Sequence, residues 1–281
     1  MRCAWEAYLN ILPLWMRQQT DKQGRDSLQE IRLRLDRPPE LVKANGSIWM
    51  DRAIKREDLD FVVNAASRYS PWTSETIRLG YISAPGGHRI GLCGNAVGEG
   101  GSLGVREVTS LCVRVARDFP GISGNLATLK GAIVVLGAPG SGKTTLLRDI
   151  IRQKSEKYEE TVSVVDERGE IFPQWQNSFC FYPGKRTDVL YGCAKATAIP
   201  ILLRTMTPKI IAVDEITAEE DCKALLQASR CGATLIATAH AEDIKTFRTR
   251  DIYRKLLENN VFCHYIWMHR DQSWTQERMD I

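Results

Sequence analysis

The chain has 281 residues, of which 43% are hydrophobic and 26% are charged, and its formal net charge at pH 7 is +4. This length suits two domains, and the composition is that of a globular protein, which excludes a disordered chain. A net charge this small does not indicate a nucleic-acid-binding protein. No stretch reaches the ~18 apolar residues that span a bilayer. Because Glu6, Asn10 and Pro13 interrupt the N-terminal region, we expect no signal peptide and a cytoplasmic location.

The first part of the chain, residues 1–120, mixes helical and strand patterns. Apolar side chains have helical spacing over residues 4–18, where Pro13 is expected to kink the helix. We interpret this stripe as core, and docking to a membrane-protein partner is the alternative. The patterns further predict a strand over 30–35, a helix over 59–69, a hairpin over 81–93, a glycine-rich loop over 94–104 and a strand over 111–115. We therefore expect a smaller α+β N-terminal domain.

The second part, residues 121–281, alternates apolar strands with helical segments. Strands are predicted over 132–136, 161–165, 209–213, 233–238 and 261–268. Helices are predicted over 143–156, 193–206, 218–230 and 245–257. Such βα repetition predicts an α/β domain with a parallel sheet and helices on both faces.

A phosphate-binding loop opens the second part. The pattern G-x-x-x-x-G-K-[ST] is matched at every position, by Gly137, Ala138, Pro139, Gly140, Ser141, Gly142, Lys143 and Thr144, and Thr145 follows in the helix. Glycines let the backbone turn its N–H groups towards phosphate oxygens. Lys143 would reach the β- and γ-phosphates, and the Thr144 hydroxyl would ligate Mg²⁺. The sequence thus predicts ATP and Mg²⁺ as cofactors; a chance glycine loop is the alternative.

Two carboxylates, Asp214 and Glu215, end the apolar strand of residues 210–213. We expect Asp214 to face the Mg²⁺ shell and Glu215 to polarise the attacking water. An acidic surface turn without function is the alternative interpretation.

Polar residues also end two other predicted strands. Asp166, Glu167, Arg168 and Glu170 follow one of them, and His240 ends the strand that contains Thr238. In a parallel sheet these carboxyl ends lie along one edge, where ligands bind. His240 could therefore contact or sense the γ-phosphate, although a histidine at a strand end is often only a satisfied polar residue.

The order of these four elements resembles the type II/IV secretion ATPase superfamily, with its Walker A loop, Asp box, Walker B strand and His box. Residues 203–209 are similar to the segment that precedes Walker B in that superfamily, and residues 224–240 to its alanine-rich helix and Thr-x-His-Ala box. Within the superfamily, the chain is similar to the stage III sporulation protein AA family over roughly residues 25 to 245. The segments that carry this closer resemblance are 30–34, 80–82, 85–94, 165–168 and 186–190.

The resemblance implies a RecA-like P-loop NTPase that hydrolyses ATP. Its expected role is that of a motor for assembly or transport at the mother-cell to forespore channel during sporulation. It further implies a homo-oligomer, a hexameric ring with ATP at subunit interfaces, docked on the cytoplasmic face of membrane channel proteins and thus peripheral at the inner face of the membrane. Interface sites of this kind need arginines from a neighbouring copy, and the candidates are Arg168, Arg186, Arg204 and Arg230.

The chain departs from the superfamily pattern at two places. Asp214 stands where many members have Gly, and Asp166-Glu167-Arg168 replaces Glu-Asp-Pro. The water-positioning carboxylate therefore stays open between Glu215, Glu167 and Glu170.

Two other functions are compatible with a phosphate-binding loop. One is a nucleic-acid-associated ATPase, but the chain has no Lys/Arg-rich run, so we expect no nucleic-acid partner. The other is a nucleotide-gated scaffold with little turnover, which the set of Lys143, Asp214 and Glu215 disfavours.

Overall fold

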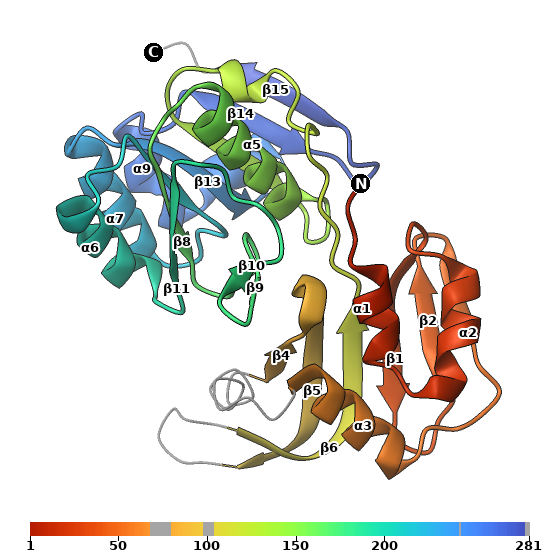
Figure 1. The fold of residues 1–281 in the computed structure, drawn as a ribbon. Coiled ribbons are helices and arrows are strands. Elements are labelled where there is room, and N and C mark those ends of the chain that lie inside the picture. Colours follow the sequence, from red (N-terminus) through yellow and green to blue (C-terminus); the bar gives the residue numbers. More distant parts are fainter. Residues whose placement is uncertain (68–79, 98–103, 242, 279–281) are drawn as a thin grey trace. The chain divides into compact units, whose positions relative to one another are not determined.

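The computed structural model describes residues 1–67, 80–97, 104–241 and 243–278, which form two compact units (Figure 1). Unit 1 comprises Met1–Asp118 together with Pro173–Phe181, and unit 2 comprises Phe119–Phe172 together with Tyr182–Ile281. Each unit has its own sheet and its own hydrophobic core. No helix in these ranges is both long enough and apolar enough to cross a membrane.

Unit 1 is built on a six-stranded antiparallel sheet of order β3-β2-β1-β6-β5-β4. The strands are β1 (Leu28–Arg34), β2 (Glu40–Lys43), β3 (Gly46–Trp49), β4 (Tyr81–Ser83), β5 (Arg89–Val97) and β6 (Gly104–Arg114). The predicted hairpin is confirmed, since β4 and β5 pair across the short 3-10 helix η1 (Pro85–Gly87). Part of the segment predicted as a glycine-rich loop is strand instead, because β5 continues to Val97; residues 98–103 lie outside the described residues.

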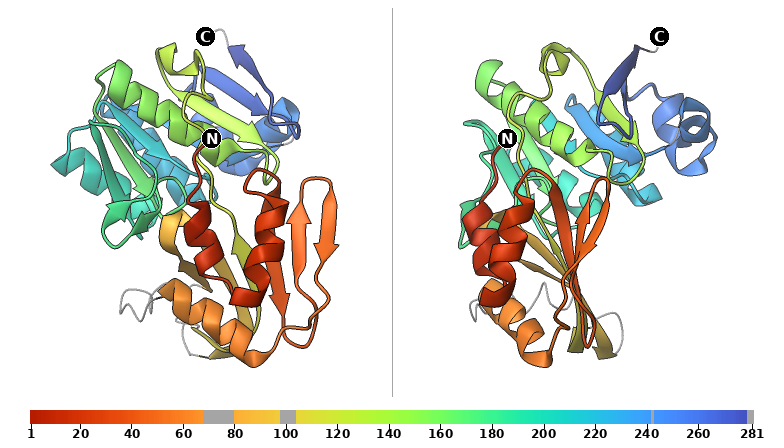
Figure 2. Two further views of the ribbon diagram at one scale, coloured as in Figure 1. Left: turned by 45° about the vertical axis from the view of Figure 1, so that its right-hand side comes forward. Right: turned by 90° about the vertical axis from the view of Figure 1, so that its right-hand side faces the viewer.

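Three helices cover one face of the unit 1 sheet (Figure 2): α1 (Trp5–Asn10), α2 (Leu14–Gln23) and α3 (Arg56–Ser67). The expected single kinked helix is wrong, because Pro13 separates α1 from α2 and stands at the N-cap of α2. Its missing N–H and fixed φ suit the start of a helix rather than its interior. Tyr8 and Leu12 are fully buried, so the stripe is core. Residues 68 and 69 of the helix predicted over 59–69 lie outside the described part of the chain.

Unit 1 also contains a short hairpin from the distant segment Pro173–Phe181. Its strands are β9 (Gln174–Trp175) and β10 (Ser178–Phe179). The hairpin packs on η1 so closely that a Cβ atom at Gly87 would lie 2.9 Å from Pro173 Cγ. Gly87 has a φ of 81°, so both the contact and the backbone conformation require glycine there.

Unit 2 is built on a seven-stranded sheet of order β11-β8-β12-β13-β7-β14-β15. All neighbouring strands are parallel except the β14–β15 pair. The strands are β7 (Ile133–Gly137), β8 (Val162–Asp166), β11 (Thr187–Tyr191), β12 (Ile210–Val213), β13 (Thr234–His240), β14 (His264–Met268) and β15 (Trp274–Arg278). The predicted strands are confirmed, whereas β11 and β15 are additional edge strands.

Helices cover both faces of the unit 2 sheet, as predicted. They are α5 (Lys143–Lys157), α6 (Lys195–Thr205), α7 (Glu219–Arg230), α8 (Ile244–Thr249) and α9 (Arg254–Glu258), with the 3-10 helices η2 (Leu126–Thr128) and η3 (Asp251–Tyr253). The chain moves one way along the sheet from β7 to β8 and the other way from β11 to β12 and β13. Because parallel crossovers are right-handed, α5 covers one face and α6 and α7 cover the other (Figure 1).

This topology brings functional residues to one edge of the unit 2 sheet. The carboxyl ends of β7, β8, β12 and β13 meet there, since these strands are parallel and in register. The phosphate-binding loop and the residues that follow Asp166, Val213 and Ala239 therefore lie next to one another.

Candidate active site

The phosphate-binding loop connects the buried strand β7 to α5. Gly142 stands at the N-cap of α5 with a φ of 96°, and among the described residues no side chain caps this helix end. The first N–H groups of α5 and the positive end of its dipole therefore face the loop, which is an arrangement that binds phosphate. Ser141 Oγ is buried and lacks a hydrogen-bond partner within the described part of the chain. A triphosphate fits this cradle, because its oxygens would accept these donors.

Glycine is also required where the loop begins. Gly137 has a φ of 153°, and a Cβ atom there would lie 2.7 Å from the carbonyl oxygen of Met268, in β14. The neighbouring strand β14 thus fixes the path of the backbone at the start of the loop.

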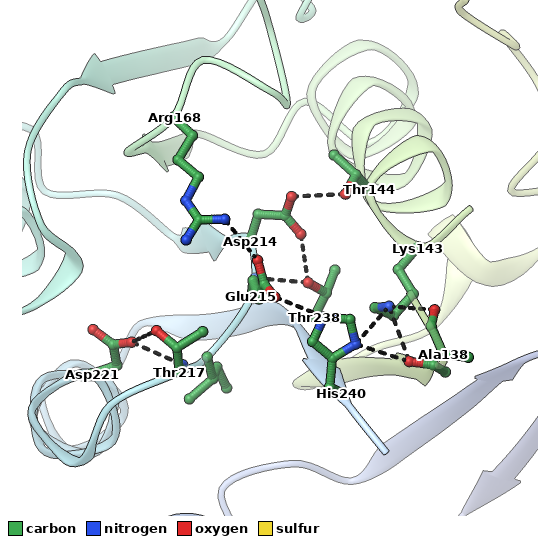
Figure 3. A network of polar contacts seen from close by, with 12 residues as sticks. Ala138, Lys143, Thr144, Arg168, Asp214, Glu215, Thr217, Asp221, Thr238 and His240 are labelled. Carbon is green, nitrogen blue, oxygen red and sulfur yellow. Dashed lines mark hydrogen bonds and ion pairs between the residues drawn. The ribbon is translucent and has the colours of Figure 1, made fainter. Parts of the chain in front are cut away.

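Lys143 folds back onto its own loop. Its Nζ donates hydrogen bonds to the carbonyl oxygens of Gly137 and Ala138, at 3.0 and 2.8 Å, and lies 3.2 Å from Nδ1 of His240 (Figure 3). Burial lowers the pKa of Lys143, while Asp214 and Glu215 oppose this shift. Each of the three N–H donors of the ammonium has an acceptor here, so Lys143 is held beside the loop that would bind phosphate.

His240 joins Lys143 to Glu215. An ammonium can only donate, so Nδ1 of His240 accepts from Lys143 and the ring proton is assigned to Nε2. Nε2 then donates to Oε1 of Glu215 at 2.7 Å. The other oxygen of Glu215 lies 3.3 Å from Nη1 of Arg168, in a pair that is open to solvent. The sequence placed these four residues at one edge, and the structure brings them into a continuous chain of contacts.

Asp214 is held between the phosphate-binding helix and β13. Its Oδ2 accepts the hydroxyl proton of Thr144 at 2.8 Å, and its Oδ1 accepts the hydroxyl proton of Thr238 (Figure 3). Hard oxygen ligands from Thr144 and Asp214, side by side, are the donor set that Mg²⁺ prefers beside substrate phosphates. These residues therefore fit the metal site that the sequence predicts.

The backbone of Glu215 adopts a left-handed conformation, with a φ of 51°. Such a conformation costs a non-glycine residue about 1–2 kcal/mol. It is held by β13, because the N–H of Glu215 donates to Thr238 Oγ1 at 2.7 Å and the N–H of Ile216 donates to the Thr238 carbonyl at 2.9 Å. This sharp turn directs the side chain of Glu215 to His240.

Asp166 organises the turn after β8. Its buried carboxylate accepts N–H hydrogen bonds from Glu170, Ile171 and Phe172, at 2.8, 3.1 and 2.9 Å. Burial raises the pKa of Asp166 to about 6, and the N–H groups of Phe172 and Ile171 oppose the rise. Asp166 thus shapes the loop that carries the other carboxylates.

Glu167 and Glu170 line a small cavity next to Glu215. The cavity is lined by charged side chains and one threonine, which are Asp166, Glu167, Arg168, Glu170, Lys195, Asp214, Glu215 and Thr217. Within it Glu167 Oε2 lies 2.7 Å from Nζ of Lys195. Of the three candidate carboxylates, only Glu215 contacts His240 among the described residues.

The remaining candidate arginines lie away from this edge. Arg204 ends α6 and lines a groove with Pro208, Lys209 and Cys231, close to where β12 begins. With a rise of about 3.3 Å per residue, the length of β12 puts on the order of 13 Å between that end and Asp214. Arg186 precedes β11 and pairs with Glu159, and Arg230 ends α7 near Asn259. For these three arginines, an action at a neighbouring copy's site stays a prediction.

Two residues of the site have no role in the sequence-based interpretation. Thr238 belongs to the Thr-x-His-Ala pattern, but only the structure shows that its hydroxyl contacts both Asp214 and the N–H of Glu215. Lys195 stands at the start of a predicted helix, where the sequence pattern gave no sign of a buried cation.

Sequence comparison relates nearly all of the chain to one family. The family described as "Sporulation stage III, protein AA" matches residues 5–277. Stage III sporulation protein AA of Bacillus subtilis (strain 168) is 35% identical over 260 residues, which cover 86% of this chain and 83% of the relative. The protein SEEDLING PLASTID DEVELOPMENT 1 of Arabidopsis thaliana is 27% identical over 255 residues, which are 85% of this chain and 34% of that protein.

Solved structures share the fold. The ATPase DotB of Legionella pneumophila superposes with a TM-score of 0.61 at 17% identity, covering 95% of this chain and 80% of DotB. The pilus retraction motor PilT with bound ADP superposes with a TM-score of 0.63 at 15% identity, covering 95% of this chain and 82% of PilT. The predicted fold, a secretion-ATPase-like α/β domain after a smaller N-terminal α+β part, is confirmed.

Proposed function

Because the chain belongs to the sporulation stage III protein AA family, we propose that it is an ATP-hydrolysing motor of the secretion-ATPase type. Its proposed task is to power assembly or transport at the mother-cell to forespore channel. The proposal includes a ring of identical subunits, hexameric by analogy with secretion ATPases, docked on the cytoplasmic face of membrane channel proteins.

The observation that carries the proposal is the contact chain at the carboxyl edge of the unit 2 sheet. Lys143, His240 and Glu215 follow one another at hydrogen-bond distance, and Asp214 contacts the hydroxyl of Thr144 beside them. A fortuitous glycine loop would need neither a carboxylate on its threonine nor a histidine between its lysine and a second carboxylate. The set is what ATP hydrolysis requires.

Each residue has a proposed task. Residues 137–145 would hold the triphosphate through backbone N–H groups, with Lys143 leaving the Gly137 and Ala138 carbonyls for the β- and γ-phosphates. Thr144 and Asp214 would hold Mg²⁺, which neutralises the charge that develops on the phosphate oxygens. Glu215 would orient the attacking water, and His240 would keep that carboxylate in place.

The first experiment compares ATP hydrolysis by the full chain with that of Lys143→Ala and Glu215→Gln. We expect Mg²⁺-dependent turnover in the wild type, loss of ATP binding in Lys143→Ala, and retained binding with turnover reduced at least about a hundredfold in Glu215→Gln. Glu220→Gln is the matched control, because Glu220 is an exposed carboxylate on α7 and should leave turnover unchanged. Light scattering with and without ATP should give the mass of a hexamer.

Two outcomes would contradict the proposal. Tight ATP binding without turnover in the assembled ring would indicate a nucleotide-gated scaffold. Turnover that survives Glu215→Gln would show that another carboxylate orients the water.

A further inference from the structure

Lys195 is a buried cation in an electrostatically unfavourable place. It is the first residue of α6, where the helix dipole disfavours positive charge, and it is only 5% exposed. A buried ammonium is costly unless carboxylates compensate it. Two do so here, since Nζ lies 2.7 Å from Oε2 of Glu167 and 3.7 Å from Oδ2 of Asp221.

One partner of Lys195 lies in the turn after β8, and the other, on α7, holds the turn after β12. Glu167 directly follows Asp166, whose side chain shapes the turn after β8. Asp221 accepts the N–H groups of Thr217 and Ala218, at 3.1 and 3.2 Å, so it shapes the turn that begins with Asp214 and Glu215 (Figure 3). Lys195 is thus the charge that joins the turn after β8 to the turn after β12.

Resting on the function proposed above, we propose that Lys195 is a positioning residue of the ATPase site. Its ammonium fixes the distance between the two turns and thereby sets Glu215 against the bound triphosphate. It also engages Glu167, so Glu167 serves as an anchor for Lys195 rather than as the carboxylate that orients water. This assigns different tasks to two carboxylates that line the same cavity.

The test is a double-mutant cycle on ATP turnover by the full chain. Lys195→Met keeps the aliphatic length of the side chain and removes its charge. We expect kcat to fall about tenfold or more, with KM for ATP changed less than about threefold, because the phosphate-binding loop is untouched. Glu167→Gln should cause a similar loss, and the double variant should be no worse than the poorer single variant, since both remove the same bridge.

A matched control separates this role from the loss of any lysine. Lys223 lies one turn into α7, its side chain is 54% exposed, and its Nζ lies 4.0 Å from the exposed carboxylate of Glu220. Lys223→Met should therefore leave kcat and KM unchanged. The kcat-against-KM split is essential here, because mere loosening of unit 2 would weaken nucleotide binding as well.

Several results would overturn the inference. A Lys195→Met protein with kcat within about twofold of wild type would exclude a positioning role. Multiplicative losses in the double variant would show that Lys195 and Glu167 act separately. If Glu167→Gln abolishes turnover as fully as Glu215→Gln does, Glu167 orients the water instead.

Failure of the inference is distinguishable from failure of the proposed function. An inactive wild-type protein would reject the ATPase function, and the positioning role with it. An active wild type with an unaffected Lys195→Met variant would reject only the role of Lys195. Urea unfolding of the same variants tests the interaction of the two side chains directly. If they interact, the changes in unfolding free energy caused by Lys195→Met and Glu167→Gln should be non-additive in the double variant.

Discussion

Thr238 links the two Walker B carboxylates through one hydroxyl group. The Thr238 hydroxyl donates a hydrogen bond to Asp214 and accepts one from the N–H of Glu215. The hydroxyl therefore acts as donor and acceptor at the same time. Thr238 is completely buried. Removing its hydroxyl would leave both partners without a hydrogen bond, and restoring these bonds with water would cost free energy. The left-handed turn at Glu215 depends on this contact.

We therefore expect Thr238→Val to impair the protein in two ways. Valine has the same shape, so the loss is that of hydrogen bonds alone, and it should cost about 1–3 kcal/mol of unfolding free energy. ATP turnover should fall about tenfold or more, because both carboxylates lose their support. Urea unfolding and a steady-state ATPase assay measure the two effects.

Thr238→Ser is the control for this prediction, because serine keeps the hydroxyl and loses only a methyl group. It should retain most of the turnover. Equal activity of the valine and wild-type proteins would mean that the hydroxyl does not position the carboxylates.

At the level of elements, the sequence predicts best those strands that are apolar throughout. β7, β12 and β13 are buried between helices, so their apolar runs identify them and place Lys143, Asp214 and His240 at one sheet edge. β11 and β15 lie at the ends of the sheet, where neither strand is fully buried, and their mixed composition gives no such signal. The sequence pattern could not predict the pairing of Lys195 with Glu167 either, because it joins side chains from two elements that are far apart in the sequence.

A buried histidine holds three segments of unit 1 together. Nε2–H of His88, which directly precedes β5, donates to the Ala4 carbonyl before α1, and Nδ1 accepts the N–H of Ala116 after β6, both at 3.0 Å. The contact with Ala116 requires a neutral ring, because a protonated imidazole has no acceptor at Nδ1. Burial, with a contribution from Arg117, lowers the pKa of His88 to about 4, despite the opposing contact with Ala4.

This lowered pKa makes the stability of the protein depend on pH. Between about pH 6.5 and pH 4 the unfolded chain binds a proton at His88 that the folded chain does not bind, so unfolding becomes easier as the pH falls. The contribution is present in full above pH 6.5 and amounts to about 3 kcal/mol lost at pH 4. His88→Gln can keep both hydrogen bonds and does not titrate.

The measurement is urea unfolding of both proteins at several pH values. The unfolding free energy of the wild type should fall relative to that of His88→Gln as the pH falls from 6.5 to 4, by about 1.4 kcal/mol per pH unit. A difference that is independent of pH would show that His88 titrates alike in both states.

At the scale of the whole molecule, the position of Arg204 has a consequence for assembly. Because Arg204 lies at the end of the unit 2 sheet opposite to its own phosphate-binding loop, a catalytic role requires the site of a neighbouring copy. Arg204→Ala and Lys143→Ala should each be inactive as pure proteins. When they are mixed and allowed to assemble, some interfaces combine an intact Lys143 with an intact Arg204, and turnover should reappear.

Recovery should rise with the time allowed for subunit exchange, up to roughly a quarter of the wild-type rate for a random mixture with independent interfaces. Lys209→Ala, a change in the same groove, is the control. Full activity of pure Arg204→Ala would remove this residue from the catalytic set.

The hairpin of residues 173–181 has a practical consequence for dissecting the protein. The polypeptide passes between the two units three times, at Asp118–Phe119, at Phe172–Pro173 and at Phe181–Tyr182. A gene fragment that starts near codon 120 would encode the phosphate-binding loop and every carboxylate of the site. It would also encode a hairpin whose packing surface, η1, had been left on the other fragment. Complementation by two separately expressed halves should therefore succeed only if the hairpin of one half finds its place on the other.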